Sequence, residues 1–244
     1  MPDHTKEGKM DKIRYRFHRW VTDLIFPIEC AGCGKEGEWI CKECYDRLDR
    51  PSYFRCSRCH RRTNEGAICF LCSKKLYIDG ILAAGDYNHE IVYNAIHYLK
   101  FYFVKDISVP LASFLEESFA SFLCSLKRDK DILLTPISLH PKRKKWRGFN
   151  QSEKIARELC QRFDLECHPY LHRMRYNTPQ AKLDKNSRWN NISNSFQWKG
   201  EGLSGKKVIV VDDVVTTGAT LEECARTLKK SGAKKVSGLV VAKG

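Results

Sequence analysis

Two neighbouring carboxylates at the end of an apolar run form the most specific chemical feature of this sequence. They are Asp212 and Asp213, and the four residues before them, 208–211, are all Val or Ile. Such a β-branched run predicts a buried strand, and open α/β sheets bind their ligands at the carboxyl ends of the strands. The pair therefore predicts a polar ligand at that edge of a sheet.

The segment that follows the acidic pair is small and rich in hydroxyl groups. Residues 214–220 read Val-Val-Thr-Thr-Gly-Ala-Thr, and a helix is predicted from about Thr220 to Lys230. Backbone N–H groups at a helix N-terminus, helped by threonine hydroxyls, favour a bound phosphate. Gly218 lets the backbone approach the anion. Thr220 and Glu223 have the spacing of a capping box, which would set where the helix begins.

A ribose 5-phosphate matches both features, because its sugar and its phosphate lie side by side. The two aspartates would accept hydrogen bonds from the 2- and 3-hydroxyls, directly or through Mg²⁺, while the turn holds the 5-phosphate. The pattern resembles the signature with which type I phosphoribosyltransferases bind phosphoribosyl pyrophosphate (PRPP), except that Ala219 stands where that family usually has a second glycine. The PRPP-binding residues that this resemblance implies are Asp212, Asp213, Val214, Thr216, Thr217, Gly218, Ala219 and Thr220.

Eight of the 12 cysteines form four Cys-x-x-Cys pairs, which are Cys30/Cys33, Cys41/Cys44, Cys56/Cys59 and Cys69/Cys72. Each turn presents two thiolates to one ion, and two turns complete a closed tetrahedral site, so the eight thiolates predict two structural Zn²⁺ ions. The gaps of seven, eleven and nine residues between the pairs favour sequential pairing. Interleaved pairing, with loops of 22 and 24 residues, stays open as the alternative.

The balance of charge favours an anionic partner. The chain has 43 Lys and Arg against 29 Asp and Glu, a formal net charge of +14, which suits phosphate, nucleotide or nucleic acid without choosing among them. Five cations fall within residues 141–151, although a solvated basic loop would also account for them. Near the start, cations and aromatic residues are interleaved, as in proteins that bind single-stranded nucleic acid. These residues are Lys9, Lys12, Arg14, Tyr15, Arg16, Phe17, Arg19 and Trp20.

Three regions must position these residues: a basic arm over residues 1–22, a double zinc-ribbon module over 23–77 and a larger domain over 78–244. The larger region alternates strand-like apolar runs with amphipathic helical patterns, which predicts an α/β domain with a mainly parallel sheet flanked by helices. The predicted strands cover residues 78–87, 131–137, 207–211 and 236–242. The predicted helices cover about 92–99, 111–126, 152–163 and 220–230.

Over most of its length the chain also resembles the ComF family (ComFC-type) of competence proteins. The likeness is carried by residues 26–30, Leu99-Lys100, the Arg-Gly-Phe-Asn-Gln-Ser run at 147–152, the Asn-Thr-Pro-Gln-Ala run at 177–181, and Arg188-x-x-Asn191. It implies a type I phosphoribosyltransferase fold behind a double zinc ribbon. It also implies a role in the uptake of single-stranded DNA, beside other DNA-uptake proteins. Lys100 and Arg147 would contact pyrophosphate, and residues 140–150 and 175–191 would form a cover over the site.

The sequence is consistent with two functions. The first is a PRPP-binding protein that acts in competence and single-stranded DNA uptake, and the second is an active phosphoribosyltransferase of nucleotide metabolism with an unknown acceptor. Turnover would displace pyrophosphate, bound with Mg²⁺, from C1 of the ribose through electrostatic stabilisation. The candidate catalytic residues would be Asp212, Asp213, Lys100 and Arg147. No residue stands out as a general base.

We expect a cytoplasmic protein without membrane insertion. No uninterrupted apolar run approaches the roughly 18 residues that a membrane helix needs, and the first 20 residues lack the apolar block of a secretory signal.

Overall fold

The computed structural model describes residues 27–51, 54–126, 129–176 and 192–244. The chain divides into two compact units, Met1–Arg47 and Leu48–Gly244. The division falls between the second and third cysteine pairs, so the larger unit includes the second half of the cysteine-rich region. The boundaries at 22/23 and 77/78 stay predictions, and the basic arm lies outside the described residues.

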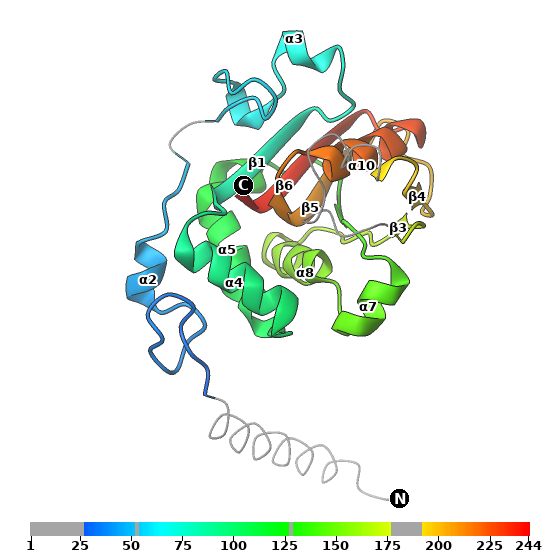
Figure 1. Ribbon diagram of the computed structural model, residues 1–244. Coiled ribbons are helices and arrows are strands. Elements are labelled where there is room, and N and C mark those ends of the chain that lie inside the picture. Colours follow the sequence, from blue (N-terminus) through cyan, green and yellow to red (C-terminus); the bar gives the residue numbers. More distant parts are fainter. Residues whose placement is uncertain (1–26, 52–53, 127–128, 177–191) are drawn as a thin grey trace, which may run out of the picture. The chain divides into compact units, whose positions relative to one another are not determined.

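A parallel four-stranded sheet organises the larger unit (Figure 1). Its strands are β1 (Gly80–Asp86), β2 (Ile132–Pro136), β5 (Lys207–Val215) and β6 (Lys235–Lys243), in the order β1-β6-β5-β2. The central strands β5 and β6 are mostly buried, as expected of parallel strands covered on both faces. The sheet confirms the predicted fold class.

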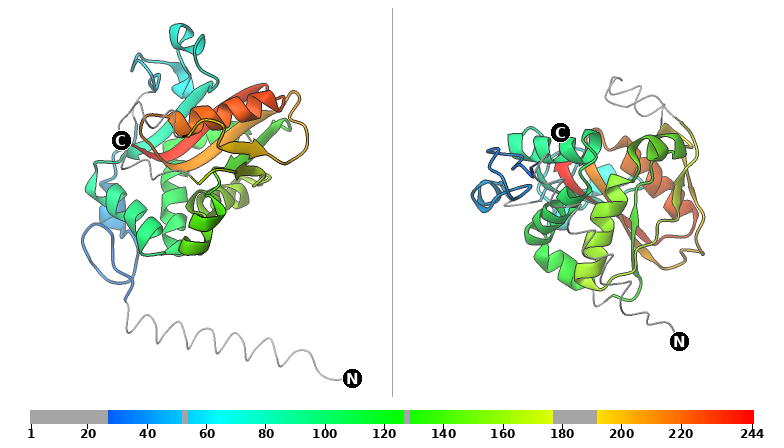
Figure 2. Two further views of the ribbon diagram at one scale, coloured as in Figure 1. Left: turned by 45° about the vertical axis from the view of Figure 1, so that its right-hand side comes forward. Right: turned by 90° about the horizontal axis from the view of Figure 1, so that it is seen from below.

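Helices cover both faces of this sheet (Figures 1 and 2). On one face lie α4 (Glu90–Phe101), α5 (Ser108–Ser118) and α8 (Gln151–Phe163), and on the other lies α10 (Ala219–Lys230). A 3₁₀ turn, η2 (Lys105–Ile107), leads into α5. The apolar stripes predicted for α8 and α10 are buried against the sheet, which fixes the position of both helix N-termini near the carboxyl end of β5.

The single helix predicted over residues 111–126 is wrong in one respect. The chain breaks at Phe119 into α5 and α6 (Ala120–Leu126), and the helical run Lys105–Ser118 makes an angle of 93° with α6. Phe119 leaves the helical region with φ −135° and places its ring 5.9 Å from that of Phe54. This bent pair passes a length and composition test for a membrane span, whereas no single helix in the described residues does.

The basic stretch after β2 is a helix rather than a loop. Helix α7 (Pro141–Arg147) begins with Pro141, whose missing N–H is not needed at that position. It ends at Gly148, which has φ +77° and is thus in the left-handed region that glycine tolerates. The cover implied for residues 177–191 lies outside the described residues.

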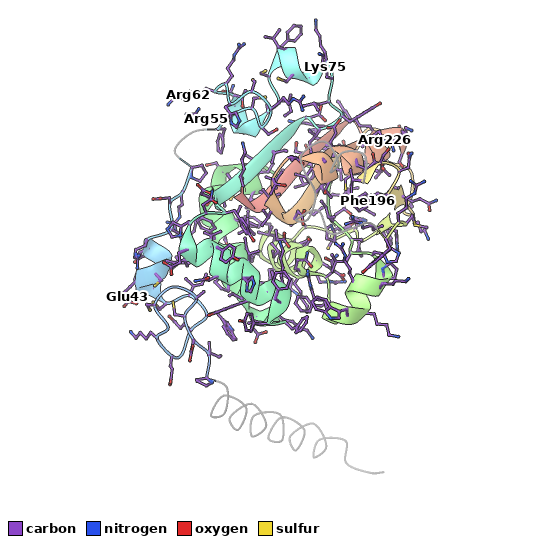
Figure 3. The ribbon with its side chains drawn as sticks, viewed as in Figure 1. Glu43, Arg55, Arg62, Lys75, Phe196 and Arg226 are labelled. Atoms are coloured by element: carbon purple, nitrogen blue, oxygen red, sulfur yellow. The ribbon has the colours of Figure 1, made fainter. Side chains whose placement is uncertain are left out.

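A short antiparallel pair, β3 (Leu171–Arg173) and β4 (Phe196–Trp198), was not expected from the sequence. It lies on the α10 side of the sheet, where Arg226 of α10 donates to the Asn194 side chain at 2.7 Å, just before β4 (Figure 3). The cysteine-rich parts add α2 (Lys42–Asp46) in the smaller unit, and η1 (Asn64–Gly66) and α3 (Phe70–Ser73) in the larger one.

Candidate functional site

The acidic pair lies inside β5 rather than after it, because the strand continues to Val215. Asp213 is only 3% exposed, and its Oδ1 lies 2.7 Å from the Lys100 Nζ, which comes from the last turn of α4. Its other oxygen, Oδ2, is buried without a hydrogen-bond partner among the described residues. A buried carboxylate oxygen of this kind is a candidate ligand for a cation or for a sugar hydroxyl.

Asp212 is held by a second helix, α8. The Ser152 hydroxyl, in the first turn of α8, donates to Asp212 Oδ1 at 2.8 Å. Burial, together with the negative charge of Asp213, raises the pKa of Asp212 to about 7. Near neutral pH this carboxyl group is therefore divided between its two protonation states, and a bound cation would favour the ionised form.

A second cation approaches the pair from α7. Arg147 donates to Gln151 Oε1 at 2.6 Å, and its guanidinium carbon lies 6.0 Å from the centre of the Phe101 ring. Burial lowers the pKa of Arg147, while Asp213 counteracts this effect, and its buried Nε has no partner in the described part of the chain. The structure thus brings Lys100, Arg147 and the acidic pair together from three elements. Their catalytic roles stay predictions.

The turn after β5 differs in detail from the expectation. The N-cap of α10 is Gly218, with φ +80°, so the helix begins at Ala219 and the predicted capping box of Thr220 and Glu223 is wrong. Glu223 instead binds Arg226, with distances of 2.6 and 2.9 Å. Ala219 is buried, so its methyl group packs inward, away from the surface of the turn.

Sequence reasoning missed Arg173 on β3. Burial lowers its pKa, the negative charge of Asp212 counteracts this effect, and its buried Nε lacks a partner within the described ranges. Arg173 lines a cavity of about 610 Å³ together with three lysines, two histidines and one glutamate, which are Lys144, Lys145, Lys199, His140, His172 and Glu153. No local pattern marks Arg173, because β3 is only three residues long and its partner strand lies beyond residue 191.

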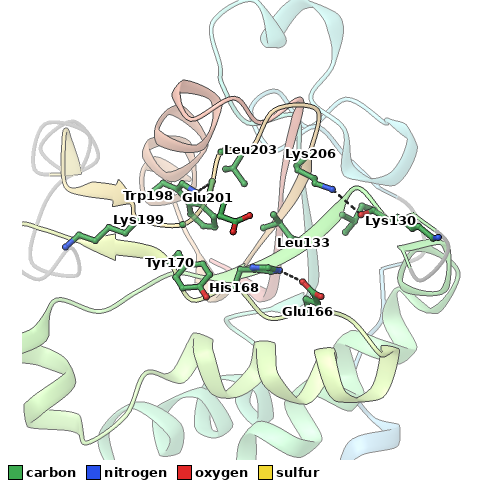
Figure 4. A pocket seen from close by; sticks show the side chains of 13 residues that line it. Lys130, Leu133, Glu166, His168, Tyr170, Trp198, Lys199, Glu201, Leu203 and Lys206 are labelled. Carbon is green, nitrogen blue, oxygen red and sulfur yellow. Dashed lines mark hydrogen bonds and ion pairs between the residues drawn. The ribbon is translucent and has the colours of Figure 1, made fainter.

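A larger cavity, of about 770 Å³, lies near the starts of β2 and β5, far along the strands from the acidic pair (Figure 4). Its lysines are offset by acidic groups: Lys206 lies 3.0 Å from Asp131, and Glu166 and Glu201 also line the space. The rings of His168 and Tyr170 also line this cavity, and His168 Nε2 lies 3.0 Å from Glu166 Oε2. None of the predicted site residues lines it, and ligands of parallel sheets bind at the other ends of the strands.

The eight paired cysteines form two clusters in the sequential arrangement. One contains Cys30, Cys33, Cys41 and Cys44 and the other Cys56, Cys59, Cys69 and Cys72, and within each the sulfur atoms all lie within 4.8 Å of one another. A tetrahedral Zn²⁺ with bonds of about 2.3 Å needs sulfurs roughly 3.8 Å apart, so both clusters fit zinc.

The pKa values of the clustered cysteines also favour binding of a cation. Burial opposes ionisation of Cys30 and Cys56, but backbone N–H groups directed at their sulfurs lower both pKa values to about 6. Burial and the neighbouring thiols raise the pKa of Cys72 to about 12. Zn²⁺ would hold all four sulfurs as thiolates and would act structurally, since each cluster fills four coordination positions.

Comparison with known proteins agrees with this architecture. The phosphoribosyl transferase domain family matches residues 149–244, and the double zinc ribbon domain family matches residues 21–73. A solved structure of a purine phosphoribosyltransferase from Pyrococcus horikoshii is 16% identical in sequence, and its alignment covers 55% of this chain and 83% of that chain. Its TM-score of 0.33 is too low to support a conclusion. Fold and clusters together define a phosphoribosyltransferase-type domain joined to a double zinc ribbon.

Relatives with closer sequences are also found. The competence protein ComFC of Bacillus subtilis is 30% identical over 206 residues, which are 81% of this chain and 81% of that protein. The DNA utilization protein YhgH of Escherichia coli K12 is 31% identical over 82% of this chain and 88% of its own. The chain belongs to the ComF family, which includes these proteins.

Proposed function

We propose that the protein binds PRPP at the carboxyl end of β5 and that it acts in the handling of single-stranded DNA. The observation that carries PRPP binding is the buried Asp213, which is neutralised on one oxygen by Lys100 and unpartnered on the other, next to the glycine-capped start of α10. The aspartates bind the ribose hydroxyls, and the turn from Thr216 to Thr220 holds the 5-phosphate.

Mg²⁺, bound together with PRPP, would neutralise part of the pyrophosphate charge. Lys100, which pairs with Asp213, and Arg147, whose charge interacts with Asp213, are the cations that contact the pyrophosphate in this proposal. If the protein also catalyses phosphoribosyl transfer, the same two cations stabilise the departing pyrophosphate, and the two aspartates favour the positive charge that grows on the ribose. The acceptor would enter from the cationic cavity that Arg173 lines.

Calorimetry with PRPP and Mg²⁺ tests this site. We expect Asp212→Asn combined with Asp213→Asn, and separately Thr217→Ala combined with Gly218→Val, to weaken binding at least tenfold without unfolding the protein. A matched control is Glu166→Gln with Glu201→Gln, which removes two carboxylates from the distant cavity and should leave affinity unchanged. Full affinity in both test variants would refute the assignment, and release of pyrophosphate during incubation would establish turnover.

The DNA role is supported by the net charge of +14 and by relatives whose names refer to competence and DNA utilization. We expect weak binding to single-stranded DNA, stronger than to duplex, with a log-log salt slope of about −0.7 per neutralised phosphate. Replacing Arg14, Arg16 and Arg19 together should reduce both affinity and slope. Trp20→Ala should reduce affinity alone, because stacking releases no counterions. No binding to labelled single-stranded DNA near physiological salt would exclude the role.

A further inference from the structure

The second cysteine cluster belongs to the same hydrophobic core as the helix that begins at the proposed phosphate turn. Cys56 is completely buried, and Ile68 is 8% exposed. Both belong to one cluster of buried residues with Ile81 of β1 and with Leu221 in the first turn of α10. Residues 56–72, which we call the knuckle, therefore pack into the same core as α10 and the sheet.

Backbone hydrogen bonds strengthen this connection. Ile68 donates its N–H to the Asp79 carbonyl oxygen at 2.9 Å, and Ala67 forms an antiparallel bridge with Gly80. Further along, the N–H groups of Tyr77 and Ile78 donate to the two carboxylate oxygens of Glu222, at 2.8 and 3.1 Å. Glu222 lies in the first turn of α10, four residues after the Gly218 cap, so the chain that follows the knuckle is bonded to the start of that helix.

The turn between the cysteines of the third pair reaches the phosphate turn itself. Ser57 and Arg58 line one small cavity together with Thr216, Thr217 and Gly218. Arg58 is exposed, so its guanidinium is accessible to a ligand. An arginine in that position offers paired N–H donors that match the oxygens of a phosphate.

We propose that Arg58, held by zinc in the second cluster, is part of the phosphate site and contacts the 5-phosphate of the bound sugar. The inference rests on the proposed PRPP site and adds one cation to it from outside the phosphoribosyltransferase-type domain. Zinc in the second cluster then supports ligand binding, because it fixes the turn from Cys56 to Cys59 that presents Arg58. Zinc in the first cluster, which lies in the other compact unit, has no such role.

A comparison of two arginines in the same knuckle tests the contact. Arg58 and Arg61 are both exposed, and replacing either with Ala removes the same charge, but only Arg58 lines the cavity with the phosphate turn. By calorimetry with PRPP and Mg²⁺, and with ribose 5-phosphate alone, we expect Arg58→Ala to weaken both affinities at least tenfold. Arg61→Ala should change them less than twofold. Equal effects of the two substitutions, or none from Arg58→Ala, would overturn the contact.

A second comparison tests the dependence on zinc. Cys56→Ser with Cys59→Ser, and Cys30→Ser with Cys33→Ser, should each lower the zinc content from two ions per chain to one. We expect the first variant to lose PRPP affinity and the second to keep it. Wild-type affinity in a folded Cys56 and Cys59 variant would overturn the zinc dependence, and if that variant does not fold, the two arginine substitutions decide alone.

The outcomes also separate this inference from the function on which it rests. Wild-type protein that binds neither PRPP nor ribose 5-phosphate would refute the proposed function. Wild-type protein that binds PRPP, with Arg58→Ala binding equally well, would refute only the contribution of the knuckle.

Discussion

At the scale of single residues, the site keeps two carboxyl groups side by side in a largely buried strand. Asp213 pairs with a lysine, whereas Asp212 accepts a hydrogen bond from the Ser152 hydroxyl, and burial and the charge of Asp213 raise the pKa of Asp212 to about 7. In the free protein, an ionised Asp212 is therefore a source of instability. Such groups are typical of sites where ligand binding, not folding, determines the residue type.

Asp212→Asn should stabilise the free protein in a pH-dependent way. The folded pKa lies above the unfolded value of about 3.9, so ionisation weakens the native state as pH rises between these values. The advantage of the variant should be small near pH 4, grow towards pH 7 and then level off. At pH 8 we expect Tm to rise by at least roughly 2 °C. A lower Tm, or an equal gain at all pH values, would contradict this explanation.

The same titration should appear in ligand binding. If the ionised Asp212 is the binding form, affinity for PRPP with Mg²⁺ should rise roughly tenfold between pH 6 and pH 8, as the ionised fraction rises across a pKa near 7. Ser152→Ala should move the midpoint to higher pH, because the Ser152 hydroxyl lowers the pKa of Asp212. Calorimetry across this range measures both, and a pH profile unchanged in Asp212→Asn would show that other groups titrate.

At the scale of elements, the sequence predicted what local periodicity determines. The strand before the acidic pair, the helices α8 and α10 and the four cysteine pairs all follow from short patterns. The break at Phe119 has no glycine or proline to signal it and arises from tertiary packing of the ring. The partners of the acidic pair, Ser152 and Lys100, come from distant helices, so no local pattern links them to β5.

The junction between η1 and β1 offers a test at this scale. Gly66 has φ +67°, and a Cβ at this position would lie 2.3 Å from the backbone oxygen of Ile81, so Gly66→Ala must displace the chain. We expect a loss of roughly 3 kcal/mol in the free energy of unfolding, measured with urea. Gly205→Ala is the control: it has φ +77° but open space around it, and should cost about 1 kcal/mol. Equal losses would mean that the contact with β1 is not the cause.

At the scale of the whole molecule, the two cysteine clusters fall in different compact units. Elemental analysis of folded, reduced protein should give two zinc ions per chain. Limited proteolysis of the Cys30→Ser, Cys33→Ser variant should cut within residues 27–47, because a zinc knuckle without its metal loses its folding energy locally. A folded sample without zinc would refute both sites, and cuts spread over residues 48–244 would contradict local unfolding.

The strand order β1-β6-β5-β2 has a consequence for how the chain folds as it is synthesised. The first strand of the sheet pairs with the last, and about 150 residues separate them. At about 5–20 residues per second, a ribosome needs roughly 8–30 s to make that stretch. During this time β1 and the apolar side chains Ile68, Ile78 and Ile81 have no β6 and no α10 to pack against. Zinc can already hold the knuckle in its final shape during this time. When β6 is synthesised, it then pairs with β1 beside a surface that is already folded. Fewer residues remain to be ordered in this slow, non-local pairing step.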